Sequence, residues 1–259
     1  MNKLLRETLT LAFDQPLWSL AIRAKARAKV GVILGDAHIR KTGLNRAFIS
    51  FAFARMAKDQ REQSSKKADY LNFLHELIKK EGLPLMDETV RTYSREDFRY
   101  NTQNSSLYFR TQSIEELRPL ADMFLDEAAA KHIPKNIAEE LTHRSLAFLI
   151  MDDGQQVKRG GVTLCTDSFD LEEVNILQEA LKLNFNLDTN IHHKKSNNGS
   201  IYERIYIPKA GLDEIKPSII PHIHDSMLYK INAGVGFKKN TEGFESNQES
   251  EMEIDLIDT

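Results

Sequence analysis

Two aspartates end apolar segments in the two halves of this 259-residue chain. Asp36 ends the apolar run of "VGVILGDA" (30–37), and Asp153 stands near the end of "SLAFLIMDDG" (145–154). Both runs are typical of buried helices. A carboxylate at a helix C-terminus faces the negative end of the helix dipole, which costs a few tenths to about 1 kcal/mol unless a cation lies nearby. Each aspartate is therefore a candidate cation ligand.

A simpler explanation exists for one such segment, because glycine often follows the last residue of a helix. Two copies favour the functional interpretation. If the two helix ends meet, Asp36 and Asp153 lie side by side and their like charges repel. A divalent cation relieves that repulsion, and carboxylate oxygens favour Mg²⁺, Mn²⁺ or Ca²⁺ over zinc.

The elements that must position these aspartates occur twice along the chain. "IEELRP" (114–119) and "LDEIKP" (212–217) match at a separation of 98 positions, and each opens an apolar-periodic helix. The first half predicts a helix, a hairpin, a helix, a second hairpin and a third helix, at about 17–36, 37–53, 68–80, 90–111 and from 114. The second half predicts the same order at 143–153, 155–166, 171–184, 188–207 and from about 212.

Helix starts are indicated by two capping boxes, Ser113-x-x-Glu116 and Asp170-x-x-Glu173. The two aspartates lie 117 positions apart, so the first half carries about nineteen more residues than the second. The polar stretch at 58–67 is the expected place for them. We expect an N-terminal extension (1–16), a first repeat (17–134), a second repeat (135–232) and a disordered acidic tail (233–259).

Composition narrows the class of protein. No apolar run approaches the length of about 20 residues that spans a bilayer, so we expect no membrane association. The single cysteine, Cys165, excludes an internal disulfide, and its apolar neighbours favour a packed thiol. The net charge is −3, but the last nineteen residues carry seven acidic side chains and no basic ones, which leaves +4 for residues 1–240. A basic surface for a polyanion is therefore permitted.

The two aspartate segments within a duplicated order of elements resemble the LAGLIDADG homing endonucleases, in the branch where one chain holds two motifs. The second segment matches the motif at Leu146, Ala147, Leu149, Ile150, Asp153 and Gly154 and departs from it at Phe148, Met151 and Asp152. The first matches at Gly31, Ile33 and Asp36, with Lys29 and Ala37 as departures. Small residues at Gly31, Gly35 and Ala147 favour close packing of the two helices.

This resemblance implies an α+β fold of two pseudo-symmetric αββαββα repeats that form a saddle-shaped antiparallel sheet surface. It implies hydrolysis of DNA phosphodiesters with Mg²⁺ or Mn²⁺ held by Asp36 and Asp153, helped by the backbone carbonyl groups of Gly35 and Asp152. The family also places a lysine after the last helix of each repeat. Lys131 and Lys230 occupy these places and lie 99 positions apart. Their expected role is to stabilise transition-state charge, and the alternative is an ordinary solvated surface lysine.

The resemblance also implies a water-orienting Gln or Asn on the second strand of each repeat. Ser50 stands there in the first repeat, and Thr163 or Cys165 in the second. This departure puts the rate of cleavage in doubt.

The hairpins carry side chains that suit the major groove of DNA, because a strand can bury one row of side chains and offer the other. A solvated sheet face has a similar composition, so each residue is only a candidate. The candidates for DNA contact are Arg40, Lys41, Asn45, Arg46, Arg91, Tyr93, Arg95, Arg99, Asn101, Gln103, Arg110, Gln155, Lys158, Arg159, His192, Lys194, Lys195, Asn197 and Arg204.

We therefore predict a monomeric, site-specific DNA endonuclease of the intron-homing type with a long recognition site. Two alternatives remain: a maturase, which binds intron RNA as a splicing cofactor with the same fold, and a DNA-binding protein that has lost cleavage. The presence of both aspartates and both lysines favours the nuclease over the last. A mitochondrial, plastid or bacterial cytoplasmic location is consistent with this prediction.

Overall fold

The computed structural model describes residues 29–54, 61–97, 102–196 and 199–233. Its framework is two four-stranded antiparallel sheets with the same strand arrangement. The first has the order β1-β2-β4-β3, with β1 (His38–Thr42), β2 (Arg46–Ala54), β3 (Arg91–Asp97) and β4 (Thr102–Arg110). The second has the order β5-β6-β8-β7, with β5 (Gly154–Gln156), β6 (Val162–Leu164), β7 (Asn190–Lys195) and β8 (Ile201–Ile207).

The helices complete the predicted αββαββα order in both halves. In the first half they are a helix at residues 29–34, α3 (Arg61–Lys80) and α4 (Arg118–Phe124), the last preceded by the 3₁₀ turn η2 (Glu115–Leu117). In the second they are α6 (His143–Asp153), α7 (Leu171–Phe185) and α8 (Lys209–Ile219). The short α5 (Ile137–Glu140) joins the halves, and the 3₁₀ segments η3 (Ile220–His222) and η4 (Asp225–Ile231) follow α8.

One of the two predicted capping boxes is confirmed. Asp170 accepts a hydrogen bond from the backbone N–H of Glu173 at 2.9 Å, and Glu173 accepts one from the N–H of Asp170 at 2.9 Å. The box at Ser113 is wrong: Ile114 precedes the 3₁₀ turn without a side-chain cap, and the Ser113 hydroxyl hydrogen-bonds Thr42 instead. The Ser113 hydroxyl, which the capping-box pattern assigned to the helix N-terminus, is thus used in a contact with a residue distant in sequence.

The extra length of the first half is spread over several elements rather than inserted at 58–67. Residues 61–67 belong to α3, and 58–60 lie outside the described residues. α3 has 20 residues where its counterpart α7 has 15. Strand β2 has 9 residues where β6 has 3. Strand β2 and helix α3 of the first half are therefore both longer than their counterparts in the second half.

Alternation along the strands divides each sheet into a buried and an open face. In β2, Ala47, Ile49, Phe51 and Phe53 are buried, and in the second sheet Val162, Leu164, Ile205 and Ile207 are buried. These residues belong to one hydrophobic core that runs through both halves. Helices α3 and α4 cover the first sheet, and α7 packs against β8. Among the described residues, these helices lie on the buried faces, and the opposite faces are called open here.

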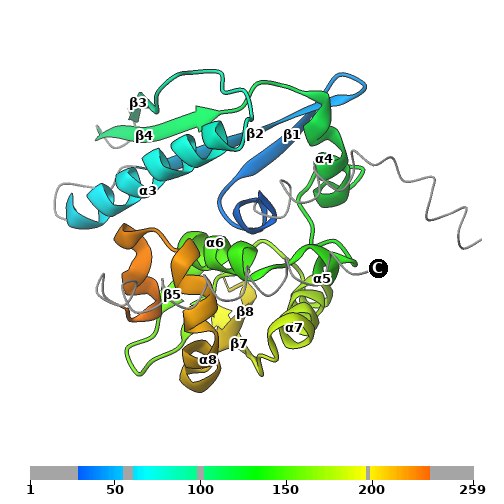
Figure 1. Cartoon of the computed structure of the whole chain (residues 1–259), viewed down its shortest axis with the longest axis vertical. Helices are drawn as coiled ribbons and strands as arrows, with labels where there is room; N and C mark the ends of the chain where they lie inside the picture. The colour runs from blue at the N-terminus through cyan, green and yellow to red at the C-terminus, as the bar shows by residue number, and fades with distance from the viewer. Residues whose placement is uncertain (1–28, 55–60, 98–101, 197–198, 234–259) are drawn as a thin grey trace, which may run out of the picture.

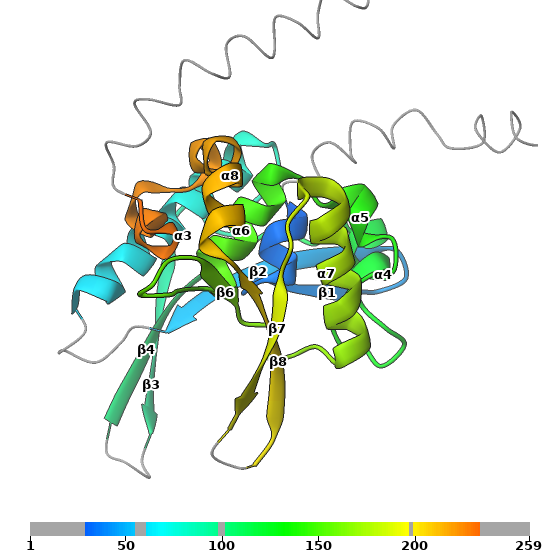
Figure 2. The same ribbon diagram turned by 90° about the horizontal axis from the view of Figure 1, so that it is seen from below.

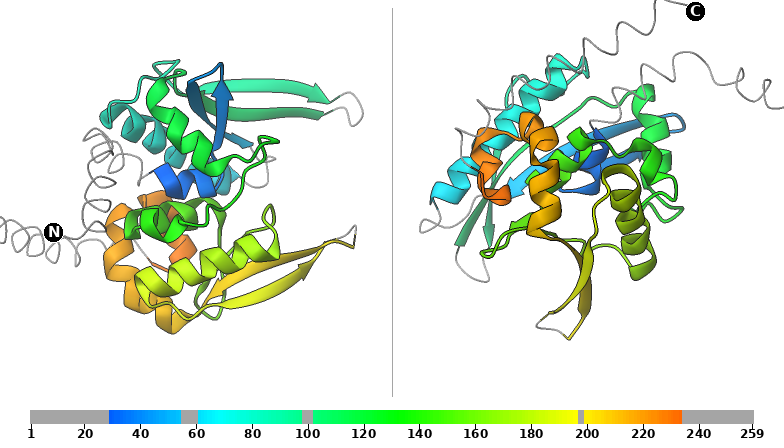
Figure 3. Two further views of the ribbon diagram at one scale, coloured as in Figure 1. Left: turned by 90° about the vertical axis from the view of Figure 1, so that its right-hand side faces the viewer. Right: turned by 60° about the horizontal axis from the view of Figure 1, so that its bottom comes forward.

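The two halves lie on either side of a central helix pair, residues 29–34 and α6 (Figure 1). The hairpins β3–β4 and β7–β8 project from the same side of the body as two arms (Figure 2, and left-hand view of Figure 3). Among the helices of the described residues, none is both long and apolar enough to cross a bilayer.

Candidate active site and nucleic-acid interface

The helix at 29–34 and α6 pack against each other at glycines. A Cβ atom on Gly31 would lie 2.0 Å from the carbonyl oxygen of Ser145 and 2.9 Å from the Cβ of Phe148. A Cβ on Gly35 would lie 2.5 Å from the Cβ of Asp152. Only glycine permits this approach, which brings the C-terminal ends of both helices together. Phe148, which departs from the motif, packs where Gly31 leaves room.

Asp36 and Asp153 lie at the joined ends, as the sequence predicted. Asp36 is exposed, and Asp153 is partly buried. Burial and the nearby charge of Asp36 raise the pKa of Asp153 to about 7, although Lys131 and Lys230 oppose the shift. The two carboxylates are thus close enough for electrostatic repulsion, and they come from different halves of the chain.

A third carboxyl group, that of Asp152, lies between the two halves. Its Oδ1 accepts a hydrogen bond from the Tyr70 hydroxyl of α3 at 2.9 Å. Its Oδ2 lies 3.4 Å from the backbone N–H of Asp36, which donates to it. Burial, followed by the charge of Asp36, raises the pKa of Asp152 well above its usual range.

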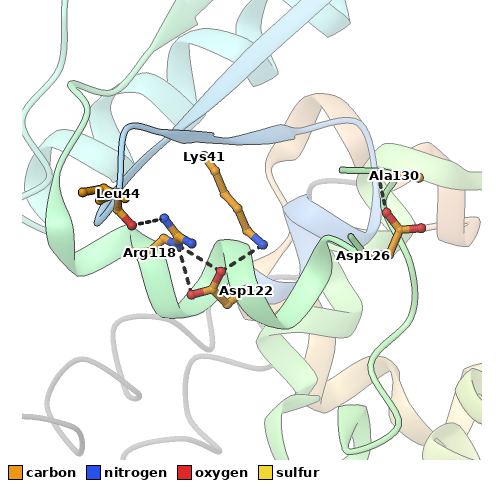
Figure 4. Close-up of polar contacts among 6 residues, drawn as sticks. All are labelled: Lys41, Leu44, Arg118, Asp122, Asp126 and Ala130. Atoms are coloured by element: carbon orange, nitrogen blue, oxygen red, sulfur yellow. Dashed lines mark hydrogen bonds and ion pairs between the residues drawn. The ribbon is translucent and has the colours of Figure 1, made fainter. Parts of the chain in front are cut away.

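Lys131 reaches the end of the first helix from a tight turn after α4. Asp126 accepts a hydrogen bond from the Ala130 N–H at 2.8 Å (Figure 4), and Ala129 adopts a left-handed conformation with φ of 60°. This turn reverses the chain. The Lys131 ammonium then donates to the carbonyl oxygens of Gly35 at 2.6 Å and Leu34 at 3.4 Å.

Lys230 makes the equivalent contact in the second half. It lies in η4 and is 8% exposed, and its ammonium donates to the carbonyl oxygens of Met151 and, at 2.7 Å, of Asp152. Burial lowers the pKa of both Lys131 and Lys230, while the surrounding aspartates act in the opposite direction. Each lysine therefore places positive charge at the negative end of a helix.

The two lysines contact backbone oxygen atoms that the sequence predicted as metal ligands. The carbonyl groups of Gly35 and Asp152, predicted as ligands, each accept a hydrogen bond from a lysine ammonium. Within the described ranges, no group of three or more His, Cys, Asp or Glu side chains is arranged to hold a metal ion. Each carbonyl oxygen has a second lone pair, so both stay candidate ligands beside the carboxylates of Asp36 and Asp153.

This donor set fits a hard divalent cation. Mg²⁺ is commonly held by one or two carboxylates, with water and substrate phosphate as the other ligands. Burial, followed by the charge of Asp36, raises the pKa of Asp153, so a negative charge at this carboxyl group is poorly compensated by the surrounding protein. A cation between the two halves would supply that compensation.

The open face of the first sheet carries much of the predicted contact set. Strand register places residues of β1, β3 and β4 on this face together: Arg40, Arg91, Tyr93, Arg95 and Arg110. The Arg110 guanidinium lies 5.4 Å from the ring centre of Phe48 on the same face, and Arg91 pairs with Asp87. Arg46 begins β2 with its Nε 3.9 Å from Glu115, and Asn45 is exposed in the β1–β2 turn.

The open face of the second sheet holds Gln155, His192, Lys194 and Arg204 in register. Arg204 is only 9% exposed, because its guanidinium forms an ion pair with Asp167 and donates to Gln155 at 3.2 Å. Lys158 and Arg159 are exposed in the β5–β6 turn. Cys165 is partly buried beside this face, and burial raises the pKa of its thiol, as expected of a packed cysteine.

Lys41 does not lie on the open face of the first sheet. Lys41 shares a face with buried Ile39, and its ammonium lies 2.9 Å from Asp122 of α4 (Figure 4). Asp122 also accepts hydrogen bonds from Arg118, whose guanidinium contacts the carbonyl oxygen of Leu44. The side chain of Lys41 thus fastens the helix to the hairpin on the side away from the open face.

One further candidate, Lys195, is not brought to the open face, and for four more the structure describes no side chain. Lys195 is exposed at the end of β7 but alternates with Lys194, so its side chain belongs to the other face. Arg99, Asn101 and Asn197 lie outside the described residues. For Gln103 only the backbone register is described, in which it pairs with Glu96.

The strand register places Ser50 and Thr163, the positions compared for water orientation, at equivalent sites. His38, two residues after Asp36, pairs with Ser50, and Gln155, two residues after Asp153, pairs with Thr163. Sequence reasoning missed Tyr70, which belongs to an ordinary apolar helix face and meets Asp152 only through the packing of α3 on α6.

Comparison with known proteins gives consistent matches. The sequence profile described as the LAGLIDADG DNA endonuclease family matches residues 27–215. The DNA endonuclease I-ChuI of Chlamydomonas applanata is 29% identical over 79% of this chain and 92% of its own length. A probable intron-encoded endonuclease of Wickerhamomyces canadensis is 26% identical over 83% of this chain and 86% of its own. Cytochrome b mRNA maturases also match.

Among solved structures, the homing endonuclease I-WcaI bound to its DNA recognition sequence superimposes with a TM-score of 0.61. The aligned residues are 24% identical and cover 82% of this chain and 88% of that one. This similarity confirms the α+β fold of two antiparallel four-stranded sheets.

Proposed function

The chain belongs to the LAGLIDADG DNA endonuclease family, and we propose that it is a homing endonuclease that cuts both strands of a specific DNA site. The observation that carries the proposal is the meeting of Asp36 and Asp153 at the joined ends of two helices from different halves. Two strands need two hydrolytic events. One carboxylate from each half suits that requirement.

The substrate would lie across the two open sheet faces. Arginine, lysine and glutamine side chains on these faces match phosphates and the base edges of the major groove. I-WcaI is a relative by fold that binds its DNA recognition sequence, and it supports this assignment by analogy. The projecting hairpins lengthen the surface, which is consistent with a long recognition site.

Asp36 and Asp153 would hold Mg²⁺ or Mn²⁺, which supplies charge neutralisation at the scissile phosphates and lowers the pKa of water. Lys131 and Lys230 fix the carbonyl groups that precede these aspartates and so orient both carboxylates. Their ammonium groups also add positive potential where negative charge develops in the transition state. The sheet residues hold the duplex in place during the reaction.

A single chain supplies both motif helices, so we propose that the protein acts as a monomer made of the repeats at 17–134 and 135–232. Relatives named as intron-encoded endonucleases suggest a gene carried in an intron, with a mitochondrion or plastid as the location and the bacterial cytoplasm as the alternative. Because other relatives are named as cytochrome b mRNA maturases, intron RNA is a second candidate partner.

The test is a cleavage selection from a randomised duplex DNA library with Mg²⁺, run beside Asp36→Asn and Asp153→Asn. We expect the wild type to cut both strands of selected duplexes. Each variant should lose cleavage by on the order of a thousandfold or more, because a bound Lewis acid contributes several kcal/mol.

Both variants should still bind the selected duplex in a gel-shift assay, since neither removes a residue of the open faces. Binding without cleavage by the wild type would contradict the endonuclease function. The remaining candidate functions would be that of a maturase and that of a DNA-binding protein that does not cleave. A parallel splicing assay with intron RNA would then separate these two.

A further inference from the structure

Asp152 belongs to the second aspartate segment, and its carboxyl group hydrogen-bonds the first half of the chain. Its counterpart in the first helix is Gly35, and the two face each other so closely that a Cβ on Gly35 would lie 2.6 Å from Asp152 Oδ2. The central pair is therefore asymmetric. A glycine in one half makes room for a carboxyl group from the other.

That carboxyl group holds two parts of the first half at once. Tyr70 donates its hydroxyl proton to Oδ1 at 2.9 Å, and the backbone N–H of Asp36 approaches Oδ2 at 3.4 Å. Tyr70 is fully buried, and its ring packs near Phe53 and Phe73. The tyrosine is thus fixed by the core, and it anchors Asp152.

From this geometry we propose that Asp152 is a positioning residue that fixes the backbone of Asp36, and that it serves the first active carboxylate rather than its neighbour Asp153. The proposal rests on the proposed nuclease function. Gly35, at the equivalent position of the first half, has no side chain that could bridge to Asp153 in return. Lys131 and Lys230 support both helix ends alike, so they do not create this asymmetry.

An unequal effect on the two DNA strands follows. A misplacement of about 1 Å at a reacting group can cost up to about a hundredfold in rate. Loss of the bridge should displace Asp36 more than Asp153. One strand should then be cut more slowly than the other, and nicked duplex should accumulate.

Three variants separate positioning from other roles. Asp152→Ala removes both contacts. Tyr70→Phe removes one hydroxyl and keeps the buried ring. Asp152→Asn keeps both links, because its carbonyl oxygen can accept from Asp36 while its amide donates to the Tyr70 oxygen. Tyr229→Phe is the matched control, since it removes one hydroxyl from a partly buried ring that lies beside Lys66.

Two readouts are measured on the full chain. The first is the ratio of cleavage rates of the two strands, each end-labelled, in a duplex that the wild type selects from the randomised library. The second is hydrogen exchange of the peptide containing the Asp36 amide, measured without DNA or metal. A general loss of stability would slow both strands together, whereas a positioning role shifts their ratio.

We expect Asp152→Ala and Tyr70→Phe to change the strand ratio by about tenfold or more and to speed exchange at Asp36. Asp152→Asn and Tyr229→Phe should stay near the wild-type ratio and exchange rate. If Asp152→Asn abolishes cleavage of both strands while exchange at Asp36 stays slow, Asp152 is a ligand and the proposal is wrong.

An unchanged ratio and unchanged exchange in both Asp152→Ala and Tyr70→Phe would overturn it as well. If the wild type cuts no duplex from the library, the nuclease function fails. The exchange measurement still decides whether the bridge to Asp36 exists.

Discussion

Lys131 and Lys230 each place an ammonium group on the last carbonyl oxygens of a helix that ends in aspartate. At the scale of single residues, this explains how acidic side chains can occupy helix C-termini. The lysines offset the helix dipole, while burial and, after it, repulsion from Asp36 raise the pKa of Asp153. The remaining negative charge is available to a cation.

His222 shows the opposite kind of shift on another part of the molecule. Burial, followed by the charges of Arg144 and His143, lowers its pKa to about 4. Above pH 6.5 the imidazole is neutral in both states. As the pH falls toward 4, the unfolded chain binds a proton that folded His222 does not, so the folded state loses stability.

We therefore predict that the contribution of His222 to the free energy of unfolding falls between pH 7 and pH 5, whatever the raised pKa of Asp153 adds in both proteins. The stability of the wild type relative to His222→Gln should decrease by about 1 kcal/mol over this range, after allowance for partial solvent exposure. Urea unfolding at both pH values measures the two differences. Parallel pH dependence in the wild type and the variant would contradict the assignment.

At the scale of elements, alternation along the strands decides which cations face a nucleic acid. Arg40 and Lys41 are neighbours on β1, yet Arg40 lies on the open face, and Lys41 pairs with Asp122 of α4 at 2.9 Å. By residue type alone, Arg40 and Lys41 are equivalent cations. The strand register separates them, because it places their side chains on opposite faces of the sheet.

The pair gives a direct test of the interface. Arg40→Ala should weaken binding to a selected duplex and lower the slope of log affinity against log salt by about 1, because one phosphate contact is lost. Lys41→Ala should leave that slope unchanged and reduce stability by up to about 1 kcal/mol through loss of the ion pair.

Affinity titrations between low and moderate salt measure the slopes, and urea unfolding measures stability. Equal slopes for Arg40→Ala and the wild type would place this strand outside the DNA contact. A lower slope for Lys41→Ala would show that its ion pair opens on binding.

At the scale of the whole molecule, the two halves share one core and one helix pair. Glu81 joins the pair at the other end, where its carboxylate lies 2.6 Å from Arg144 of α6 and 3.9 Å from Lys29 of the first helix. The joint is thus held at both ends. Any change that separates the helices should affect both halves.

Gly31→Ala should therefore lower the free energy of unfolding by about 3 kcal/mol or more, because its Cβ would meet the backbone carbonyl of Ser145, which cannot move alone. Gly211→Ala in α8 is the matched control. There the nearest atom is the end of the flexible Leu187 side chain at 3.0 Å, and alanine favours a helix by about 1 kcal/mol.

Urea unfolding followed by circular dichroism compares the two variants. We expect the control to stay within about 1 kcal/mol of the wild type. Wild-type stability in Gly31→Ala would contradict the close helix contact on which the active site depends.

Local patterns predicted much of the framework. Helical periodicity, the Asp170 capping box and strand alternation depend on residues close in sequence, and α6, α7 and the β7–β8 hairpin lie where those patterns place them. The internal duplication predicted the repeated order of elements. The Ser113 box failed because a partner distant in sequence, Thr42, competes for the same hydroxyl.

The sequence by itself determined the order of elements, the two aspartates and the two lysines, because each follows from local spacing or from the duplication. The tertiary structure decided which strand face Lys41 occupies, which carbonyl groups the lysines bind, and that Tyr70 and Asp152 meet between the halves. Such contacts depend on how whole helices and sheets pack. Many pairings satisfy the same local pattern, and only the burial of a shared core selects one of them.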